Sequence, residues 1–419
     1  MNNTPKGNRL HIALMGRTNV GKSSLLNLML GQDIAITSAV AGTTTDVVEK
    51  AMELLPLGPV LFVDTAGLDD VSELSSARLK KTAKVFDRAD VIILVTEADT
   101  WTDFDEAVLT EAQKRKIPAL IVINKNDLQK PSADHLQFLQ SKALILTVSC
   151  NDQTMRQKYL ETLKQQLLEL APADFVGNPS LIGDLLPPGG LAVLVVPIDL
   201  QAPKGRLILP QVQTIRDALD CDAMTLVVKE RELAAALTNL KTPPAVVVTD
   251  SQAILKVTED VPPEIPVTTF SILFARQKSD LAVMARGAAA IDSLQPGDKV
   301  LIAEACSHHA LEDDIGRVKL PRWLRQYVGG DLQIDTSAGR DYPDDLKQYK
   351  LILHCGACMM NRREMLGRLH KAQEAGVPVT NYGVAISFLQ GVIKRSLAPF
   401  PSALQAFVNE AKNRKQTSA

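Results

Sequence analysis

The feature that most restricts the fold is a glycine-rich stretch, GRTNVGKS, at residues 16–23. It directly follows the apolar run RLHIALM and opens a helix-like segment. A strand, a glycine-rich turn and a helix in this order surround a phosphate with backbone N–H groups and the positive end of the helix. Lys22 would then reach the β- and γ-phosphates of a nucleotide, and the Ser23 hydroxyl would bind Mg²⁺. The stretch therefore predicts a nucleotide-binding α/β domain.

Short apolar runs alternate with amphipathic segments between residue 9 and about residue 171. Such alternation predicts a mostly parallel sheet with helices on both faces. A stretch rich in Pro and Gly at residues 171–190 interrupts the pattern, and VPPEIP at residues 261–266 interrupts it again. We therefore expect an α/β protein of three domains, a P-loop domain followed by two smaller α/β domains, at residues 1–172, 180–260 and 266–410.

The composition excludes several classes of protein. The net charge of −2 and the aromatic content of 4% provide neither a broad basic face nor many stacking platforms, so we expect no nucleic-acid partner. The sequence shows no signal-peptide region and no apolar run long enough to span a bilayer. We therefore expect a cytoplasmic protein with no membrane partner.

Two further loops define the nucleotide. The sequence DTAG at residues 64–67 ends an apolar run, where Asp64 can bind the Mg²⁺ shell and the Gly67 N–H can sense the γ-phosphate. The sequence NKND at residues 124–127 ends another run, where Asp127 can accept hydrogen bonds from guanine N1 and N2. Adenine does not offer this pair of donors. The ligand is therefore predicted to be GTP, and the first domain to be a GTPase.

Other positions complete the predicted GTP site. Thr44, in the first switch loop, would place a second hydroxyl on Mg²⁺, beside Ser23 and Asp64. Ser149 and Cys150 stand where a fifth loop would contact guanine O6 through backbone N–H groups. The predicted catalytic residues are Lys22, Thr44, Asp64 and Gly67. The predicted GTP contacts are Gly16, Asn19, Val20, Gly21, Lys22, Ser23, Ser24, Asn124, Lys125, Asp127, Ser149 and Cys150.

These loops resemble those of the translation-factor-related GTPases of the Era and TrmE type. In the members of that group activated by potassium, an Asn of the phosphate loop binds K⁺, and Asn19 matches it. Leu68 stands where Ras-like GTPases carry a water-orienting Gln, so the resemblance implies slow hydrolysis stimulated by K⁺. Thr45 departs from the Arg common in the group, and Glu73 is a candidate for orienting water or else a solvated acid near a helix start.

A second group of reactive side chains lies near the C-terminus. Cys306 and His308 follow the apolar run KVLIAEA, and His354, Cys355 and Cys358 close the run LILHC. Ligands collect beyond the carboxyl ends of strands in an open α/β sheet, so the two segments can converge on one metal. Zinc would use three Cys and a His, whereas an iron–sulfur cluster would use three thiolates and leave its fourth iron to another ligand. The spacing itself leaves both metals open.

The combination of these features resembles one family across nearly the whole chain. GTPase loops, a middle α/β domain and a C-x-H, spacer, H-C-x-x-C module occur together in HydF, the GTPase that matures FeFe-hydrogenase. Three further stretches support the resemblance: APKGRLILPQVQTIRDALD, CMMNRRE and TNYGVAISF. The resemblance implies a four-iron, four-sulfur (4Fe-4S) cluster on Cys306, Cys355 and Cys358. His308, His354, Glu312 or Asp313 would then occupy the fourth iron.

The same resemblance implies partners. The chain would receive a di-iron precursor from two radical-SAM maturases and deliver it to apo FeFe-hydrogenase. Residues 180–260 would form a homodimer by joining sheets, and residues 266–410 would hold the cluster. The nucleotide would bias how the cluster domain meets its partners.

Two other functions remain open at this stage. A ribosome- or tRNA-associated GTPase with a structural zinc site would carry a basic face or an RNA-binding module, and the charge balance favours neither. A redox enzyme that uses the cluster for electron transfer would need a substrate pocket, for which the sequence gives no signal.

Overall fold

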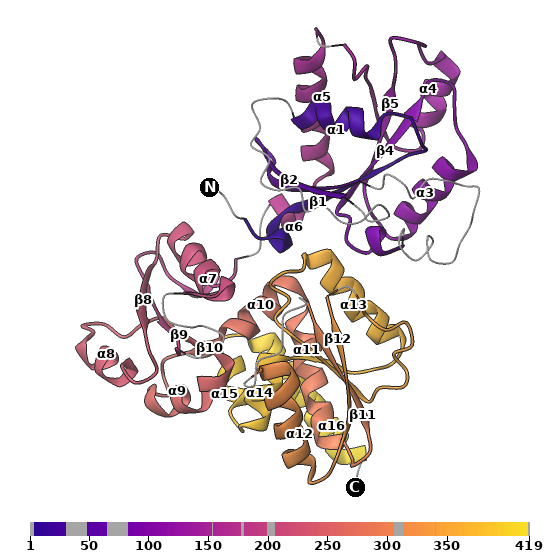
Figure 1. Cartoon of the computed structure of the whole chain (residues 1–419). Coiled ribbons are helices and arrows are strands. Elements are labelled where there is room, and N and C mark those ends of the chain that lie inside the picture. Colours follow the sequence, from indigo (N-terminus) through magenta and orange to yellow (C-terminus); the bar gives the residue numbers. More distant parts are fainter. Residues whose placement is uncertain are drawn as a thin grey trace. The chain divides into compact units, whose positions relative to one another are not determined.

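The computed structural model describes residues 4–30, 48–64, 83–152, 154–176, 180–198, 206–305, 314–339 and 341–417. The chain divides into two compact units, Met1–Asn178 and Pro179–Ala419, here called the N-terminal and the C-terminal unit (Figure 1). Within the described ranges, no helix is both long and apolar enough to cross a membrane.

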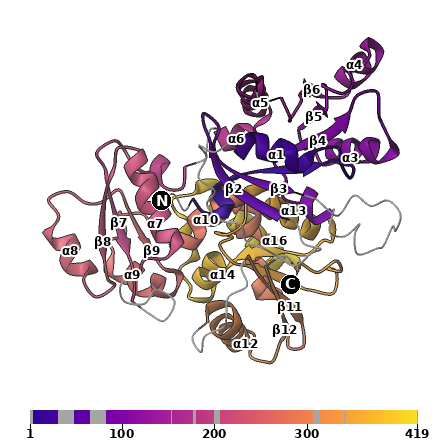
Figure 2. The ribbon, with the colours of Figure 1, turned by 45° about the horizontal axis from the view of Figure 1, so that its top comes forward.

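The N-terminal unit is built on a six-stranded sheet of order β2-β3-β1-β4-β5-β6, in which β2 is antiparallel to β3 and the other pairs are parallel (Figure 2). The strands are β1 (Leu10–Met15), β2 (Val48–Leu54), β3 (Gly58–Asp64), β4 (Val91–Glu97), β5 (Ala119–Asn124) and β6 (Leu144–Thr147). The helices described here are η1 (Lys6–Asn8), α1 (Lys22–Leu30), α3 (Asp103–Lys114), α4 (Ala133–Gln140), α5 (Arg156–Leu170) and α6 (Ala173–Val176).

Both faces of this sheet are buried. Leu10, Ile12 and Leu14 of β1 belong to a core shared with α1 and α5. Ala13 and Met15, on the opposite face, belong to a second core shared with α3 and α4. Strands buried on both faces read as continuous apolar runs, which is why the sequence predicted a mostly parallel sheet covered on two sides. The structure confirms that prediction.

The C-terminal unit contains two four-stranded parallel sheets. The first has the order β10-β9-β7-β8, with β7 (Leu191–Val195), β8 (Met224–Val228), β9 (Val246–Thr249) and β10 (Val267–Thr269). Its helices are η2 (Gly183–Leu185), α7 (Leu209–Asp220), α8 (Leu233–Asn239), η3 (Ser251–Ala253) and α9 (Ile254–Asp260). β8 is an edge strand whose Met224 and Val227 are 56% and 41% exposed.

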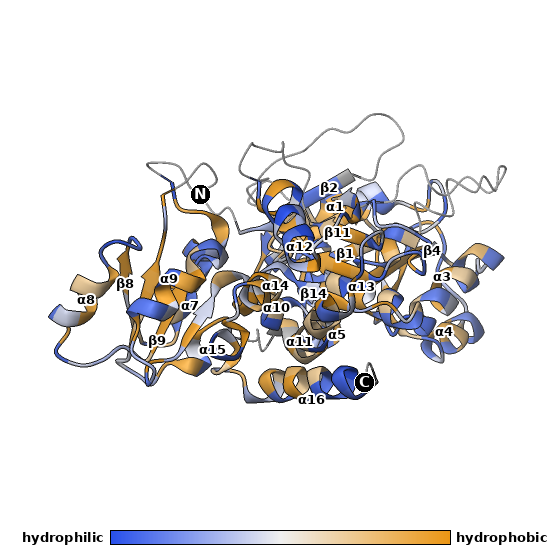
Figure 3. Ribbon diagram, turned by 90° about the horizontal axis from the view of Figure 1, so that it is seen from below, coloured by the Kyte–Doolittle hydropathy of each residue, from blue (hydrophilic) through white to orange (hydrophobic). Residues whose placement is uncertain are grey.

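The second sheet has the order β12-β11-β13-β14, with β11 (Lys299–Glu304), β12 (Gln333–Ala338), β13 (Leu351–His354) and β14 (Val379–Asn381). Its helices are α10 (Phe270–Lys278), α11 (Leu281–Ala288), η4 (Ala289–Ser293), the π-helix η5 (Ile315–Lys319), α12 (Leu320–Val328), α13 (Arg362–Glu374), α14 (Tyr382–Leu389), α15 (Ile393–Leu397) and α16 (Pro401–Thr417). α16 buries Ala403 and Phe407 and has a polar last turn (Figure 3).

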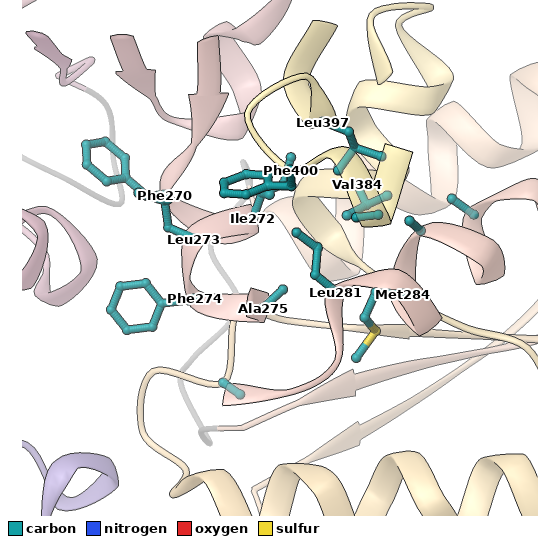
Figure 4. Close-up of a cluster of buried hydrophobic side chains, with 14 of the residues drawn as sticks. Phe270, Ile272, Leu273, Phe274, Ala275, Leu281, Met284, Val384, Leu397 and Phe400 are labelled. Carbon is teal, nitrogen blue, oxygen red and sulfur yellow. The ribbon is translucent and has the colours of Figure 1, made fainter. Parts of the chain in front are cut away.

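One hydrophobic core joins these two sheets. Phe270 and Phe274 of α10 lie in it with Leu281 and Met284 of α11 (Figure 4). The same core reaches Leu194 in the first sheet and Ile352 in the second. The second and third predicted domains therefore pack as one compact unit. Their separate boundaries remain predictions.

Candidate functional site

The phosphate loop, residues 16–21, connects β1 to α1. Gly16 has a φ of +144°, and a Cβ at this position would lie 2.3 Å from the carbonyl oxygen of Val95. Gly21 has a φ of +98°, and a Cβ there would lie 2.1 Å from Nδ2 of Asn124. A side chain at position 16 would collide with the backbone of β4, and one at position 21 would collide with the Asn124 side chain, so only glycine fits. Asn19, with a φ of 65°, also lies in the left-handed region.

Lys22 lies against the backbone of this loop. Its Nζ donates to the carbonyl oxygens of Gly16, at 2.6 Å, and Arg17, at 2.9 Å. The side chain is buried, whereas Ser23 and Ser24 in the first turn of α1 are exposed. The Lys22 ammonium is therefore held against the phosphate loop, and the Ser23 and Ser24 hydroxyls beside it are exposed to solvent.

Asn124 joins three loops of the predicted GTP site. Its buried amide donates from Nδ2 to the carbonyl oxygen of Val20 at 2.9 Å and accepts from the Cys150 N–H at 3.2 Å. The phosphate loop, the NKND loop and the loop after β6 are thereby linked through one side chain. Neutral hydrogen bonds of this kind contribute about 1 kcal/mol each, and more is lost when a buried partner is left unpaired.

Asp127 and its neighbours lie at the open side of these loops. Asp127 is exposed, and its Oδ1 accepts from the Ser149 hydroxyl at 2.6 Å. Lys125 forms an ion pair with Glu97 of β4. Burial and the Asp127 carboxylate raise the pKa of the Cys150 thiol to about 11, so Cys150 is neutral at physiological pH. The Asp127 carboxylate is therefore accessible to a guanine ring, whose N1 and N2 groups it is predicted to bind.

Asp64 occupies the carboxyl end of β3 and is buried. It pairs in register with Leu14 of β1, near the start of the phosphate loop. Thr44 and Gly67 lie outside the described residues, as do Thr45, Leu68 and Glu73. Of the predicted Mg²⁺ ligands, the structure thus describes Ser23 and Asp64.

The cysteine loop, residues 355–361, connects β13 to α13. The sulfur of Cys355 accepts a hydrogen bond from the Ala305 N–H at 3.0 Å, and the Cys355 N–H donates to the Ala303 carbonyl at 3.0 Å. Both Cys355 and Cys358 are half-buried. At the end of the loop, the Asn361 side chain accepts from the Glu364 N–H at 3.1 Å and caps α13. The end of β11 is therefore fixed against the first cysteine of the pair.

The other predicted residues of this site lie outside the described part of the chain: Cys306, His308, Glu312 and Asp313. Within the described part, no group of three metal-ligating side chains occurs. Ala305 is the residue directly before Cys306.

His354 is completely buried, and its two ring nitrogens contact protein atoms. Nδ1 lies 3.0 Å from the Cys355 carbonyl oxygen, and Nε2 lies 3.3 Å from Nη1 of Arg368. Because a guanidinium can only donate, Nε2 is the acceptor and Nδ1 carries the proton. Burial and the Arg368 charge lower the pKa of His354 to about 3. In this geometry each ring nitrogen faces a protein atom, so His354 would have to leave one of these contacts to serve as the predicted fourth ligand.

Arg368 is a residue that the sequence patterns missed. It is buried, its Nη2 donates to the Gly339 carbonyl oxygen, and its guanidinium lies 4.8 Å from the centre of the Tyr342 ring. It also lies 3.6 Å from Glu364, one turn earlier on α13. Arg368 therefore joins α13, the end of β12 and His354. Since it lies ten residues beyond Cys358, no motif signalled it.

The N-terminal unit has the sheet and the loops of a P-loop GTPase domain. Residues 11–125 match the family model described as a 50S ribosome-binding GTPase. Residues 181–279 match the hydrogen maturase F dimerization domain, and residues 282–399 match the hydrogen maturase F tetramerization domain. The latter two models together span just over half of the chain, and a GTPase domain precedes them. The chain belongs to the hydrogen maturase F family, HydF, as the sequence predicted.

Individual relatives match the GTPase domain. The tRNA modification GTPase MnmE of Dechloromonas aromatica is 31% identical over 163 residues, 39% of this chain and 35% of the relative. The GTPase Der of a Nitratiruptor species is 36% identical over 156 residues, 34% of this chain and 33% of the relative. The chain thus spans about a third of the length of these curated relatives.

Among solved structures, the G domain of the T. maritima FeoB iron transporter matches with a TM-score of 0.29 and 22% identity. The match covers 39% of this chain and 98% of that domain.

Proposed function

We propose that this chain is a GTPase and iron–sulfur scaffold that carries a di-iron precursor from radical-SAM maturases to apo FeFe-hydrogenase in the cytoplasm. Two findings support the proposal: membership of the hydrogen maturase F family and a GTPase domain at its N-terminus. The observation that carries the cluster site is the Ala305 N–H to Cys355 sulfur bond, because it fixes the residue before Cys306 beside Cys355.

The nucleotide loops would divide the work of GTP hydrolysis. Asp127 and the backbone around Cys150 would select guanine, and Lys22 would turn from the loop carbonyls to the phosphates. Ser23 and Asp64 offer oxygen ligands of the kind that Mg²⁺ prefers, and Mg²⁺ bound there would neutralise phosphate charge. Asn19 would bind K⁺, and the slow hydrolysis would make GTP a switch.

The cysteine loop offers a fitting environment for a 4Fe-4S cluster. A backbone N–H pointing at a cysteine sulfur is the kind of hydrogen bond that tunes such clusters. Cys355 and Cys358, with Cys306, would hold the cluster, which would supply an iron with an exchangeable position. We assign His354 to positioning the loop, because both its nitrogens are engaged. The fourth ligand is then His308, Glu312 or Asp313.

The edge strand β8 supports a proposal for how the homodimer forms. Met224–Val228 contains no charge and no proline, and it pairs with β7 along one side. An exposed apolar edge of this kind favours pairing with another strand. Two β8 strands related by a two-fold axis would pair antiparallel and join two four-stranded sheets into one.

The cluster is tested by iron and sulfide analysis of the anaerobically purified chain, with EPR after reduction. We expect a 4Fe-4S signal in the wild-type chain and its loss in Cys355→Ala. Cys221→Ala is the matched control, since Cys221 lies in the first sheet's domain, next to Gly183, and should leave the signal unchanged. Stoichiometric zinc without iron would contradict the scaffold and favour a structural zinc site.

A further inference from the structure

Arg17, the second residue of the phosphate loop, is partly exposed, and its guanidinium lies against the first turn of α3. Its Nε is 3.6 Å from Oδ2 of Asp105, in the first turn of α3, and the Asp105 side chain is completely buried. Both charges therefore lie in or at the edge of the core of the N-terminal unit. A buried ion pair stabilises a fold only when its geometry and its hydrogen bonds are good.

This ion pair is incompletely formed. Within the described residues, Nε and Nη2 of Arg17 and Oδ1 of Asp105 are buried and make no hydrogen bond. Oδ2 of Asp105 already accepts from the N–H of Thr102, at 2.9 Å, and from its hydroxyl, at 2.7 Å. The separation of 3.6 Å compares with about 2.8 Å in a charge-assisted hydrogen bond. A small movement of the loop toward α3 would satisfy all three atoms.

A bound nucleotide would release the loop for such a movement. The Lys22 ammonium donates to the backbone carbonyl of Arg17 at 2.9 Å, so Lys22 and Asp105 act on the same residue from its two ends. When Lys22 turns to the phosphates, the Arg17 carbonyl loses a charged donor. The ion pair between the Arg17 guanidinium and Asp105 then still connects the phosphate loop to α3.

We propose that Arg17 is a positioning residue of the nucleotide site, and that its ion pair with Asp105 closes to a hydrogen bond when nucleotide binds. Closure holds the phosphate loop in its bound conformation and transmits the bound state to the first turn of α3. The proposal rests on the GTP site assigned above, with Lys22 on the phosphates.

Trp101 is placed so that its fluorescence can report closure of the Arg17–Asp105 ion pair. Trp101 directly precedes Thr102, and its indole N–H donates to Glu106 of the same first turn at 2.8 Å. Movement of Asp105 and Thr102 should therefore change Trp101 emission. Trp323 is the other tryptophan of the chain, so Trp323→Phe isolates the signal from the GTPase domain.

The test titrates the full-length Trp323→Phe chain with GDP and GTP in Mg²⁺ buffer, following Trp101 emission. Asp105→Asn and Arg17→Gln should each weaken affinity by roughly three- to tenfold and reduce the emission change, and the double variant should be no worse than either. Asp103→Asn, an exposed acid in the same turn, should behave like the parent chain.

Two results would overturn the proposal: Asp105→Asn binding as tightly as Asp103→Asn, or effects of the two single variants that add in the double variant. Arg17→Lys adds a readout that a purely structural role would not give. It keeps the charge without the fork and should recover part of the affinity and part of the emission change. A parent chain that binds no guanine nucleotide would instead contradict the GTP site itself.

Discussion

The nucleotide loops and the cysteine loop are held in place in different ways. Around the nucleotide site, the side-chain hydrogen bonds that link one loop to another come from the motif residues themselves: Asn124 bonds to Val20 and Cys150, and Ser149 to Asp127. Around the cysteines, the fixing groups come from elsewhere, namely the Ala305 N–H and the Arg368 side chain. A site of the first kind can be read from its motif, whereas one of the second kind depends on packing that the motif does not contain.

The largest expected effect comes from breaking the link among the nucleotide loops. Asn124→Ala leaves the Val20 carbonyl and the Cys150 N–H without their partner, which should cost about 2 to 4 kcal/mol of unfolding free energy in the N-terminal unit. Because the nucleotide needs these loops in their linked arrangement, most of this free energy should also be lost from binding. Guanine-nucleotide affinity should then fall by about 100-fold. Fluorescent GDP titration and urea unfolding measure both quantities.

The matched control is Asn126→Ala, because Asn126 lies in the same loop and is only partly buried. It should bind within a few-fold of the wild-type chain, by the estimate that single surface changes cost about 0.5 kcal/mol or less. Equal losses in the two variants would show that Asn124 does not link the loops.

The corresponding break in the cysteine loop is Arg368→Gln. It removes the donor to His354 Nε2 and the attachment to Gly339, so the C-terminal unit should lose about 1 to 3 kcal/mol of unfolding free energy. Iron retained after anaerobic gel filtration should fall as well, although no cysteine has changed. Lys371→Gln, an exposed cation on the same helix, should retain its iron. Full iron content in Arg368→Gln would mean that the cysteine loop keeps its conformation without the Arg368 contacts.

The pH dependence of stability tests whether His354 positions the cysteine loop or binds the metal. Burial and Arg368 lower its pKa to about 3 in the folded chain, against about 6.5 when unfolded. Between these values the unfolded chain binds more protons, so stability falls as the pH falls from about 6.5 toward 3. For the metal-free chain we expect a loss of about 2 kcal/mol between pH 7 and pH 5.

His354→Gln should remove this part of the pH dependence, which urea unfolding at the two pH values would detect. The reduced cluster of the same variant should keep the EPR g-values of the wild-type chain. Altered g-values with an unchanged pH dependence would make His354 a ligand.

The smallest expected effect concerns the ion at the phosphate loop. GTP turnover should be several-fold faster in K⁺ than in Na⁺, and Asn19→Ala should turn over GTP equally slowly in both salts. Steady-state phosphate release measures this directly. Equal rates of GTP turnover by the wild-type chain in the two salts would contradict stimulation by K⁺.

The sequence predicted the GTPase fold because several residues of GRTNVGKS and NKND have local geometric tasks. Gly16 and Gly21 are examples, since a Cβ at Gly16 would collide with the Val95 backbone of β4 and a Cβ at Gly21 with the Asn124 side chain. It did not predict that His354 is enclosed, because that follows from Arg368 reaching back from α13. Nor did it predict that the last two domains share a core, because that depends on how Phe270 and Phe274 pack across both sheets.

The central claim, a maturation scaffold, is tested most directly by activating apo FeFe-hydrogenase. The chain is produced together with radical-SAM maturases, purified anaerobically and mixed with the apo-enzyme, and hydrogen evolution is measured. We predict activation by the wild-type chain and by Cys221→Ala, none by Cys355→Ala, and rates that differ among GTP, GDP and no nucleotide. Activation by Cys355→Ala equal to that by the wild-type chain, at the same rate in all nucleotide states, would contradict the account.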